Sequence, residues 1–183
     1  MALDIHLGKA RHWARLLPLL GALSAGLAFA ADDCERALFS CRTDHAEKTL
    51  ALCATEKEDG SGWKDVQYRF GRDGEKPELA YPADAAQGAR LMYFSHTQQG
   101  AEYRVRVRFE SGGYRYRIYS NGQADQGSAG VEVFDTRNKR VSHIRCTERP
   151  SMFSTYLRTT LACDTSTTHD GSACREEPLR TGR

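Results

Sequence analysis

Six cysteines constrain the fold of this chain more than any other feature of its sequence. They stand at Cys34, Cys41, Cys53, Cys146, Cys163 and Cys174, all beyond the first thirty residues. An even number of cysteines in an exported chain favours disulfides, because compartments outside the cytosol are oxidising. The sequence has no Cys-x-x-Cys pair and no neighbouring set of histidines, so the spacing favours disulfides over zinc ligation. We therefore expect a cross-linked chain that needs neither a metal nor a cofactor.

The first thirty residues have the pattern of a cleavable signal peptide. Three basic residues between positions 9 and 15 precede an apolar run over 16–29, and Ala28–Phe29–Ala30 provides the small residues that signal peptidase requires. A retained membrane anchor is the alternative. However, about fourteen apolar residues, interrupted by a proline and two glycines, fall short of the roughly twenty that a span needs. We expect cleavage after Ala30, export to the periplasm and no transmembrane segment in the remaining chain.

The remaining chain is formally neutral. The full sequence has 26 Lys and Arg and 24 Asp and Glu, and residues 1–30 contain three of the former and one of the latter, which leaves 23 of each. A nucleic-acid-binding protein is expected to carry a strong basic excess, so charge gives no support to nucleic acid as a partner. Residues 31–175 have the length of a single domain, and 176–183 are expected to form a disordered tail.

Short apolar and aromatic runs alternate with Gly, Asn and Asp between the cysteines, which is typical of hairpins. The predicted strands lie near 37–43, 48–54, 64–70, 78–81, 90–96, 102–110, 113–120, 130–135 and 139–147. This pattern predicts an all-β, mostly antiparallel domain, built as a meander that closes into a barrel or folds as a sandwich. We also expect one short helix within 151–163 and a long projecting loop over 120–130.

Strand phase indicates how the cysteines pair, because alternate residues of a strand face opposite sides. Cys41 lies on the predicted core face of its strand, whereas Cys53 falls on the other face of the next one. Cys146 shares a face with Ile144. Among the connectivities that six cysteines permit, the pairs we expect are Cys41 with Cys146, Cys34 with Cys53, and Cys163 with Cys174.

The clearest local signal is a hairpin over residues 103–119, in which alternation is almost perfect. Apolar side chains face one way, and the other face carries the arginines Arg104, Arg106, Arg108, Arg115 and Arg117. A turn around Ser111–Gly112 predicts a register with Phe109 opposite Tyr114, Arg108 opposite Arg115, and Arg106 opposite Arg117. Like charges directly across a ladder are unfavourable, so this register predicts a compensating feature nearby.

Two interpretations of the arginines stay open. Acidic residues of neighbouring strands, with Glu102, Glu132 or Asp135 as candidates, would interleave with them into an ordinary solvated face. Alternatively, the arginines form a basic strip for an acidic partner, since a guanidinium holds a carboxylate or phosphate through two hydrogen bonds.

Signatures of catalysis are absent from the sequence. The exported chain has four histidines, His45, His96, His143 and His169, and none lies in a recognisable motif. A Gly-x-Ser-x-Gly turn, a glycine-rich phosphate loop and a His-Glu-x-x-His pair are all missing. The sequence favours a binding protein over an enzyme, and a hydrolase whose triad is assembled only in space is the alternative.

Five short segments resemble a group of small exported proteins of Gram-negative bacteria. They are Cys41–Thr43, Lys48–Cys53, Tyr68–Gly71, Glu78–Pro82 and Gly113–Tyr116. The resemblance covers about residues 34–163, and it implies an exported, β-rich protein without implying an activity.

The chain is also similar in size, export signal, disulfides and β architecture to periplasmic lysozyme inhibitors and to immunity proteins against secreted antibacterial toxins. In the c-type lysozyme inhibitor family, a Ser-Gly-x-x-Tyr loop approaches the catalytic cleft of the enzyme. Residues 111–114, Ser-Gly-Gly-Tyr, have one residue fewer before the tyrosine, and the lysine-bearing motif of the family is not recognisable. The resemblance implies that Ser111, Gly112 and Tyr114 contact a partner.

The sequence as a whole predicts a periplasmic protein-binding module that inhibits an enzyme. Its partner would be a lysozyme or a toxin that hydrolyses cell wall or lipid. The candidate partner-binding residues are Arg104, Arg106, Arg108, Arg115, Arg117, Ser111, Gly112 and Tyr114. An envelope-associated structural protein that binds an anionic lipid or polymer is the alternative function.

Overall fold

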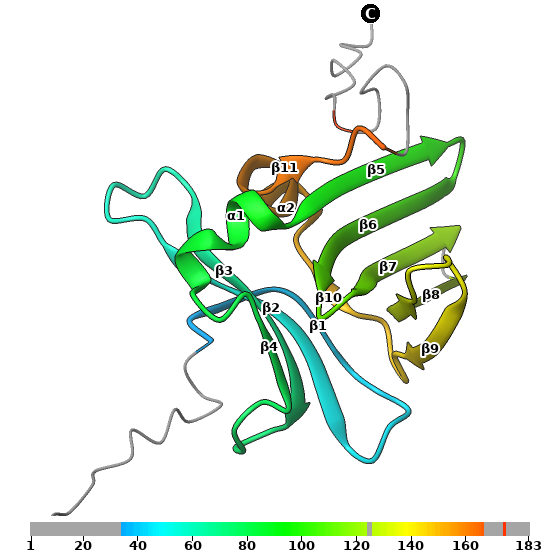
Figure 1. Ribbon diagram of the computed structural model, residues 1–183. Coiled ribbons are helices and arrows are strands. Elements are labelled where there is room, and N and C mark those ends of the chain that lie inside the picture. The colour runs from blue at the N-terminus through cyan, green and yellow to red at the C-terminus, as the bar shows by residue number, and fades with distance from the viewer. Residues whose placement is uncertain (1–33, 124–125, 167–173, 175–183) are drawn as a thin grey trace, which may run out of the picture.

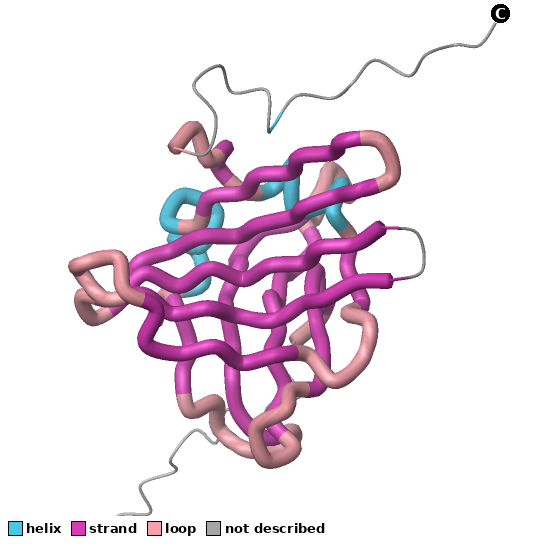
Figure 2. The backbone as a smooth tube through the Cα atoms, turned by 90° about the vertical axis from the view of Figure 1, so that its right-hand side faces the viewer, coloured by secondary structure: helices cyan, strands magenta, loops and turns pink. Residues whose placement is uncertain are grey.

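The computed structural model describes residues 34–123, 126–166 and 174. The predicted signal peptide and the predicted C-terminal tail lie outside the described residues. Two sheets pack against each other around a shared core, and their strands run across one another (Figures 1 and 2). The all-β prediction is therefore confirmed, and of its two forms the structure adopts the sandwich rather than the closed barrel.

Each sheet is a meander of strands that are mostly consecutive in the chain. The five-stranded sheet has the order β10 (Ser151–Met152), β1 (Arg36–Arg42), β2 (Lys48–Glu56), β3 (Trp63–Arg72) and β4 (Leu79–Tyr81). The six-stranded sheet has the order β11 (Ala162–Cys163), β5 (Tyr93–Gln99), β6 (Glu102–Ser111), β7 (Tyr114–Gln123), β8 (Gln126–Phe134) and β9 (Arg140–Arg145). Among the strands of the described residues, only β11 pairs in parallel, alongside β5. All other named pairs are antiparallel.

Short helices connect the sheets. A 3-10 turn (Ala85–Gln87) and α1 (Gly88–Leu91) lead from β4 to β5, and α2 (Ser154–Thr160) leads from β10 to β11. The expected helix within 151–163 is thus confirmed as α2. Residues 90 and 91, which the sequence placed in a strand, belong instead to α1, and β5 begins at Tyr93.

The predicted loop over 120–130 is wrong. Strand β7 continues to Gln123 and β8 begins at Gln126, with Gly122 paired to Gly127. The glycines of this segment allow close cross-strand contact, since a Cβ on Gly122 would overlap the ring of Tyr103. An aromatic ring that covers a cross-strand glycine is a known stabilising device in sheets.

The β6–β7 hairpin has a different register from the predicted one. Its two-residue turn is Gly112–Gly113, with φ of 59° and 79°, which is the backbone that a type I′ turn requires and that glycine adopts readily. The turn therefore lies one residue later than predicted, and every pairing shifts by two. The predicted opposites Phe109/Tyr114, Arg108/Arg115 and Arg106/Arg117 are replaced by Phe109/Tyr116, Arg108/Arg117 and Arg106/Tyr119.

The core lies between the inner faces of the two sheets, where alternate residues of each strand are buried. Its largest fully buried side chains include Phe39, Leu50, Tyr68, Phe94, Phe109 and Ile118. At the end of the sandwich near the β6–β7 turn, the rings of Tyr81, Phe109 and Tyr116 form a stack, with centroids 4.6 and 4.8 Å apart. This stack gives the turn a rigid base.

The three predicted disulfides are confirmed. Cys41–Cys146 spans 105 residues and joins β1 of one sheet to the end of β9 in the other. Cys34–Cys53 links the first described residue to β2, and Cys163–Cys174 closes a short C-terminal loop. The described residues contain no free cysteine.

Candidate protein-binding site

The outer face of the six-stranded sheet carries all five predicted arginines, with Arg115 nearest the hairpin turn. Arg104, Arg106 and Arg108 alternate along β6 with buried Val105 and Val107, so their side chains point away from the core. The register then sets Arg117 of β7 beside Arg108. The sequence anticipated this clustering, because the alternation is local.

Arg108 is ion-paired with a residue that sequence analysis missed. Its Nε and Nη2 donate to Asp164 at 3.0 and 3.2 Å, and the side chain of Asp164 is only 2% exposed. Burial by itself raises the pKa of the Asp164 carboxyl, but hydrogen bonds from Arg108 and Ser166 outweigh it and hold that pKa below its usual value. The carboxylate is therefore ionised at neutral pH, and it compensates Arg108.

Glu132 on β8 compensates two further arginines. Its Oε2 accepts from Arg117 at 2.7 Å and its Oε1 accepts from Arg140 at 2.7 Å. Burial raises the pKa of Glu132, but these two hydrogen bonds overcome that effect and lower it. Glu102 binds Arg104 at 2.7 Å. The predicted compensation by Glu102 and Glu132 is thus present, whereas Asp135 pairs with Arg137 instead.

Arg106 lies at the centre of this face without an ion pair among the described residues. Its Nη1 donates to Asn121 Oδ1 at 2.6 Å and to the carbonyl of Val105 at 2.8 Å, and its guanidinium lies 5.8 Å from the ring centroid of Tyr119. Burial and, after it, the neighbouring Arg117 lower the pKa of Arg106. Tyr119 in turn hydrogen-bonds His143 at 2.8 Å. The face is therefore a packed network and not an open row of cations.

The other predicted residues lie at the tip of the β6–β7 hairpin. Tyr114 is 45% exposed, and its side chain has no hydrogen bond or ring contact with any other described residue. Arg115 contacts Asn138 in the turn between β8 and β9. The tip is thus braced from the side by that turn and from below by the Tyr81–Phe109–Tyr116 stack. We call residues 111–114 the hairpin tip.

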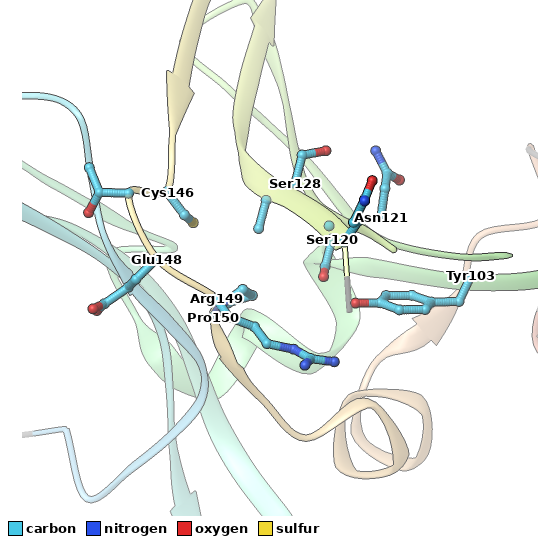
Figure 3. A pocket seen from close by; sticks show the side chains of 12 residues that line it. Tyr103, Ser120, Asn121, Ser128, Cys146, Glu148, Arg149 and Pro150 are labelled. Atoms are coloured by element: carbon cyan, nitrogen blue, oxygen red, sulfur yellow. The ribbon is translucent and has the colours of Figure 1, made fainter. Parts of the chain in front are cut away.

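A polar groove lies at the opposite end of β6, where the segment 146–150 leaves β9 and crosses to β10 (Figure 3). It comprises two hollows of about 260 and 340 Å³. The residues that line both are Tyr103, Ser120, Arg149 and Pro150. The sequence did not predict this groove, because residues 120–130 were expected to form a projecting loop and Tyr103 was taken as an ordinary hairpin residue.

A histidine and a serine share this groove, but they do not form a catalytic pair. His96 and Ser120 both pair with Val105, from opposite sides, so the β6 strand separates them. Two strand spacings set their backbones about 9.5 Å apart, and no hydrogen bond joins the two side chains. Burial and, to a smaller extent, Arg158 lower the pKa of His96, so this histidine is neutral at pH 7. The geometry therefore does not support a Ser–His hydrolase in the groove.

The described residues contain no helix that is long and apolar enough to cross a membrane. They also contain no cluster of three or more His, Cys, Asp or Glu side chains with the arrangement of a metal site. A scan against models of protein families and searches of curated proteins and of solved structures found no match.

Proposed function

We propose that this protein is an exported, periplasmic binding protein that inhibits an enzyme by inserting the hairpin tip into the catalytic cleft of that enzyme. One observation carries the proposal. Tyr114, a large aromatic residue without a partner among the described residues, is presented on a two-residue turn whose backbone is braced on two sides. Exposed tyrosines of this kind are typical anchors of protein interfaces.

Rigidity is the physical advantage of the tip. A binding loop that is already ordered loses little conformational entropy when it enters a cleft, so more of the contact energy appears as affinity. Gly112 and Gly113 leave the end of the turn narrow, with open space around both Cα atoms. A narrow, stiff projection with a tyrosine beside it suits a cleft better than a flat partner surface.

The disulfides support the same role. Disulfides persist in oxidising compartments, and the three here are compatible with a protein that acts outside the cytosol. A cell-wall or lipid hydrolase, either a lysozyme or a toxin from a competing cell, would be encountered there. The alternative role, adhesion to an anionic lipid or polymer, has less support because Arg104, Arg108 and Arg117 are ion-paired within the sheet.

An inhibition assay tests the proposal. The oxidised, exported chain is titrated against a c-type lysozyme and a panel of cell-wall and lipid hydrolases, and the residual activity is measured. We expect one enzyme to be inhibited, and we expect Tyr114→Ala to weaken inhibition at least about tenfold. Tyr156→Ala is the matched control, because Tyr156 is similarly exposed but lies on α2, away from the hairpin tip.

Two results would contradict the proposal. One is the absence of inhibition across the panel. The other is an inhibition that falls equally in Tyr114→Ala and Tyr156→Ala, because the tip would then have no special role. A steep loss of binding to anionic vesicles with added salt would instead favour the alternative role.

A further inference from the structure

The groove at the far end of β6 contains polar groups that have no partner among the described residues. Ser120 is 2% exposed, yet its hydroxyl has no hydrogen bond with any described residue. A buried hydroxyl without a partner is costly, and native proteins leave few such groups unless a bound molecule completes them. Its position in the lining of both hollows shows where that molecule would lie.

Two further donors accompany this hydroxyl. Figure 3 shows the Tyr103 hydroxyl, the Ser120 hydroxyl and the Arg149 guanidinium directed toward the same space. Neither the Tyr103 hydroxyl nor Arg149 has a hydrogen bond or ion pair with the described part of the chain. Glu148 immediately precedes Arg149 in the chain, but its carboxylate points away from the guanidinium (Figure 3). The groove therefore combines one uncompensated cation with two hydroxyl groups.

The hydroxyl groups of Tyr103 and Ser120 are held in place by the fold. The Tyr103 ring lies on Gly122, where any side chain would displace it. Ser120 is held in the middle of the sheet by pairing with Val105 on one side and Ala129 on the other. Arg149 precedes Pro150, and the Cys41–Cys146 disulfide ties the start of its segment to β1. The two hydroxyls are therefore preformed, whereas the side chain of Arg149 is exposed to solvent at the edge of the groove.

The chemistry of the groove selects the class of ligand. A guanidinium donates two parallel hydrogen bonds to a planar carboxylate, and two hydroxyls can serve its remaining lone pairs. One positive charge matches a monoanion better than a phosphate dianion, and His96 adds no charge at pH 7. Pro150, Met152 and Val105 supply an apolar wall beside these donors. The hollows of about 260 and 340 Å³ are at the small end of ligand pockets.

We propose that this groove binds the carboxylate of a small ligand, through the Arg149 guanidinium and the hydroxyls of Tyr103 and Ser120. The ligand is either a free organic acid or the carboxyl terminus of a short peptide, since both present the same group. This site is separate from the hairpin tip, because the two lie at opposite ends of β6. Its success or failure therefore does not depend on the proposed inhibition of an enzyme.

Binding of N-acetyl-alanyl-alanine to the oxidised, exported chain tests the proposal, with the C-terminal amide of the same dipeptide as the control ligand. Backbone amide shifts are followed by NMR up to about 10 mM peptide, above the dissociation constant of about 1 mM expected for a ligand of this size. We expect saturable shifts around residues 103, 120, 127–129 and 146–150 with the acid, and none with the amide. A parallel titration with propionate distinguishes a site for free organic acids from a site for peptide carboxyl termini. A site for free acids binds propionate as tightly as the dipeptide, whereas a site for peptides binds the dipeptide more tightly.

Variants connect the binding to the named groups. Arg149→Gln should weaken binding about tenfold or more, whereas Arg137→Gln, at the β8–β9 turn, should leave it unchanged. Ser120→Ala should weaken binding without lowering the melting temperature, because its hydroxyl has no hydrogen bond with any described residue. Three results would overturn the proposal: no saturable shift with either acid, equal binding of the amide, or an unchanged affinity in Arg149→Gln.

Discussion

The Arg108–Asp164 ion pair provides a sharp test of the energetics of this fold. Arg108→Leu removes the guanidinium and leaves the carboxylate of Asp164, which is 2% exposed, in place. Loss of one partner from a buried pair costs about 3–5 kcal/mol when nothing else compensates the charge. Here Ser166 continues to donate to Asp164 from its Oγ at 2.6 Å and from its backbone nitrogen at 3.1 Å. We therefore expect the free energy of unfolding to fall by about 2 kcal/mol.

The pH dependence identifies the mechanism of this loss. The pKa of Asp164 is lowered in the folded protein, so its contribution to stability is present above the unfolded pKa near 4 and is lost as the pH falls through the lower folded pKa. In Arg108→Leu, the hydrogen bonds from Arg108 no longer oppose the effect of burial, and the pKa of Asp164 rises. Protonation then relieves part of the cost of the buried carboxylate, so the difference between wild type and variant should shrink from pH 7 to pH 3.

Urea denaturation at pH 7, 5 and 3 measures this difference, with Arg104→Leu as the control. Arg104 is likewise ion-paired, with Glu102, but its side chain is 59% exposed. Exposed ion pairs contribute only about 0.2–1 kcal/mol to stability. At pH 7 the melting temperature of Arg108→Leu should be lower by about 4–8 °C. A loss no larger than that of Arg104→Leu, or a loss that is independent of pH, would refute this account.

Three other predictions concern the scaffold. Replacing Cys41 and Cys146 by alanine should lower the free energy of unfolding by about 4 kcal/mol. Replacing Cys163 and Cys174 should lower it less, because the first disulfide closes a loop of 105 residues and the second a loop of 11. Equal losses of stability in urea denaturation would contradict this order. Gly88→Ala should lower the free energy of unfolding by about 2 kcal/mol in the same assay, because a Cβ at this position would overlap the carbonyl of Val66. This loss is expected even though alanine favours helices more than glycine does. Phe109→Ala should lower the free energy of unfolding by about 3–5 kcal/mol, because its ring is buried. Tyr114→Ala should change it by less than about 0.5 kcal/mol, because Tyr114 is exposed. A large loss for Tyr114→Ala would show that this tyrosine stabilises the fold.

Much of the scaffold is predictable from local patterns. Alternation along 102–111 was sufficient to place Val105 and Val107 inward and the arginines outward, because strand periodicity depends only on the backbone. The alternation of buried and exposed residues along β1 likewise placed Cys41 on the core face, which led to its predicted pairing with Cys146. The correct hairpin register was also within reach of the sequence, since Gly112–Gly113 is the dipeptide that a type I′ turn favours.

The candidate sites depend on contacts that no local pattern encodes. Arg108 meets Asp164, 56 residues later, only because β11 adds in parallel to β5 and brings the following residue to the outer face. The groove forms only because segment 146–150 diverges from β8 and sets Arg149 opposite Tyr103 and Ser120. By itself, the sequence determined most of the strands, the buried side of β6 and which cysteines can meet, but it placed residues 120–130 in a loop where β7 and β8 continue. The tertiary structure decided which charges are compensated and which polar groups remain open to a ligand, because both depend on distances between segments far apart in the chain.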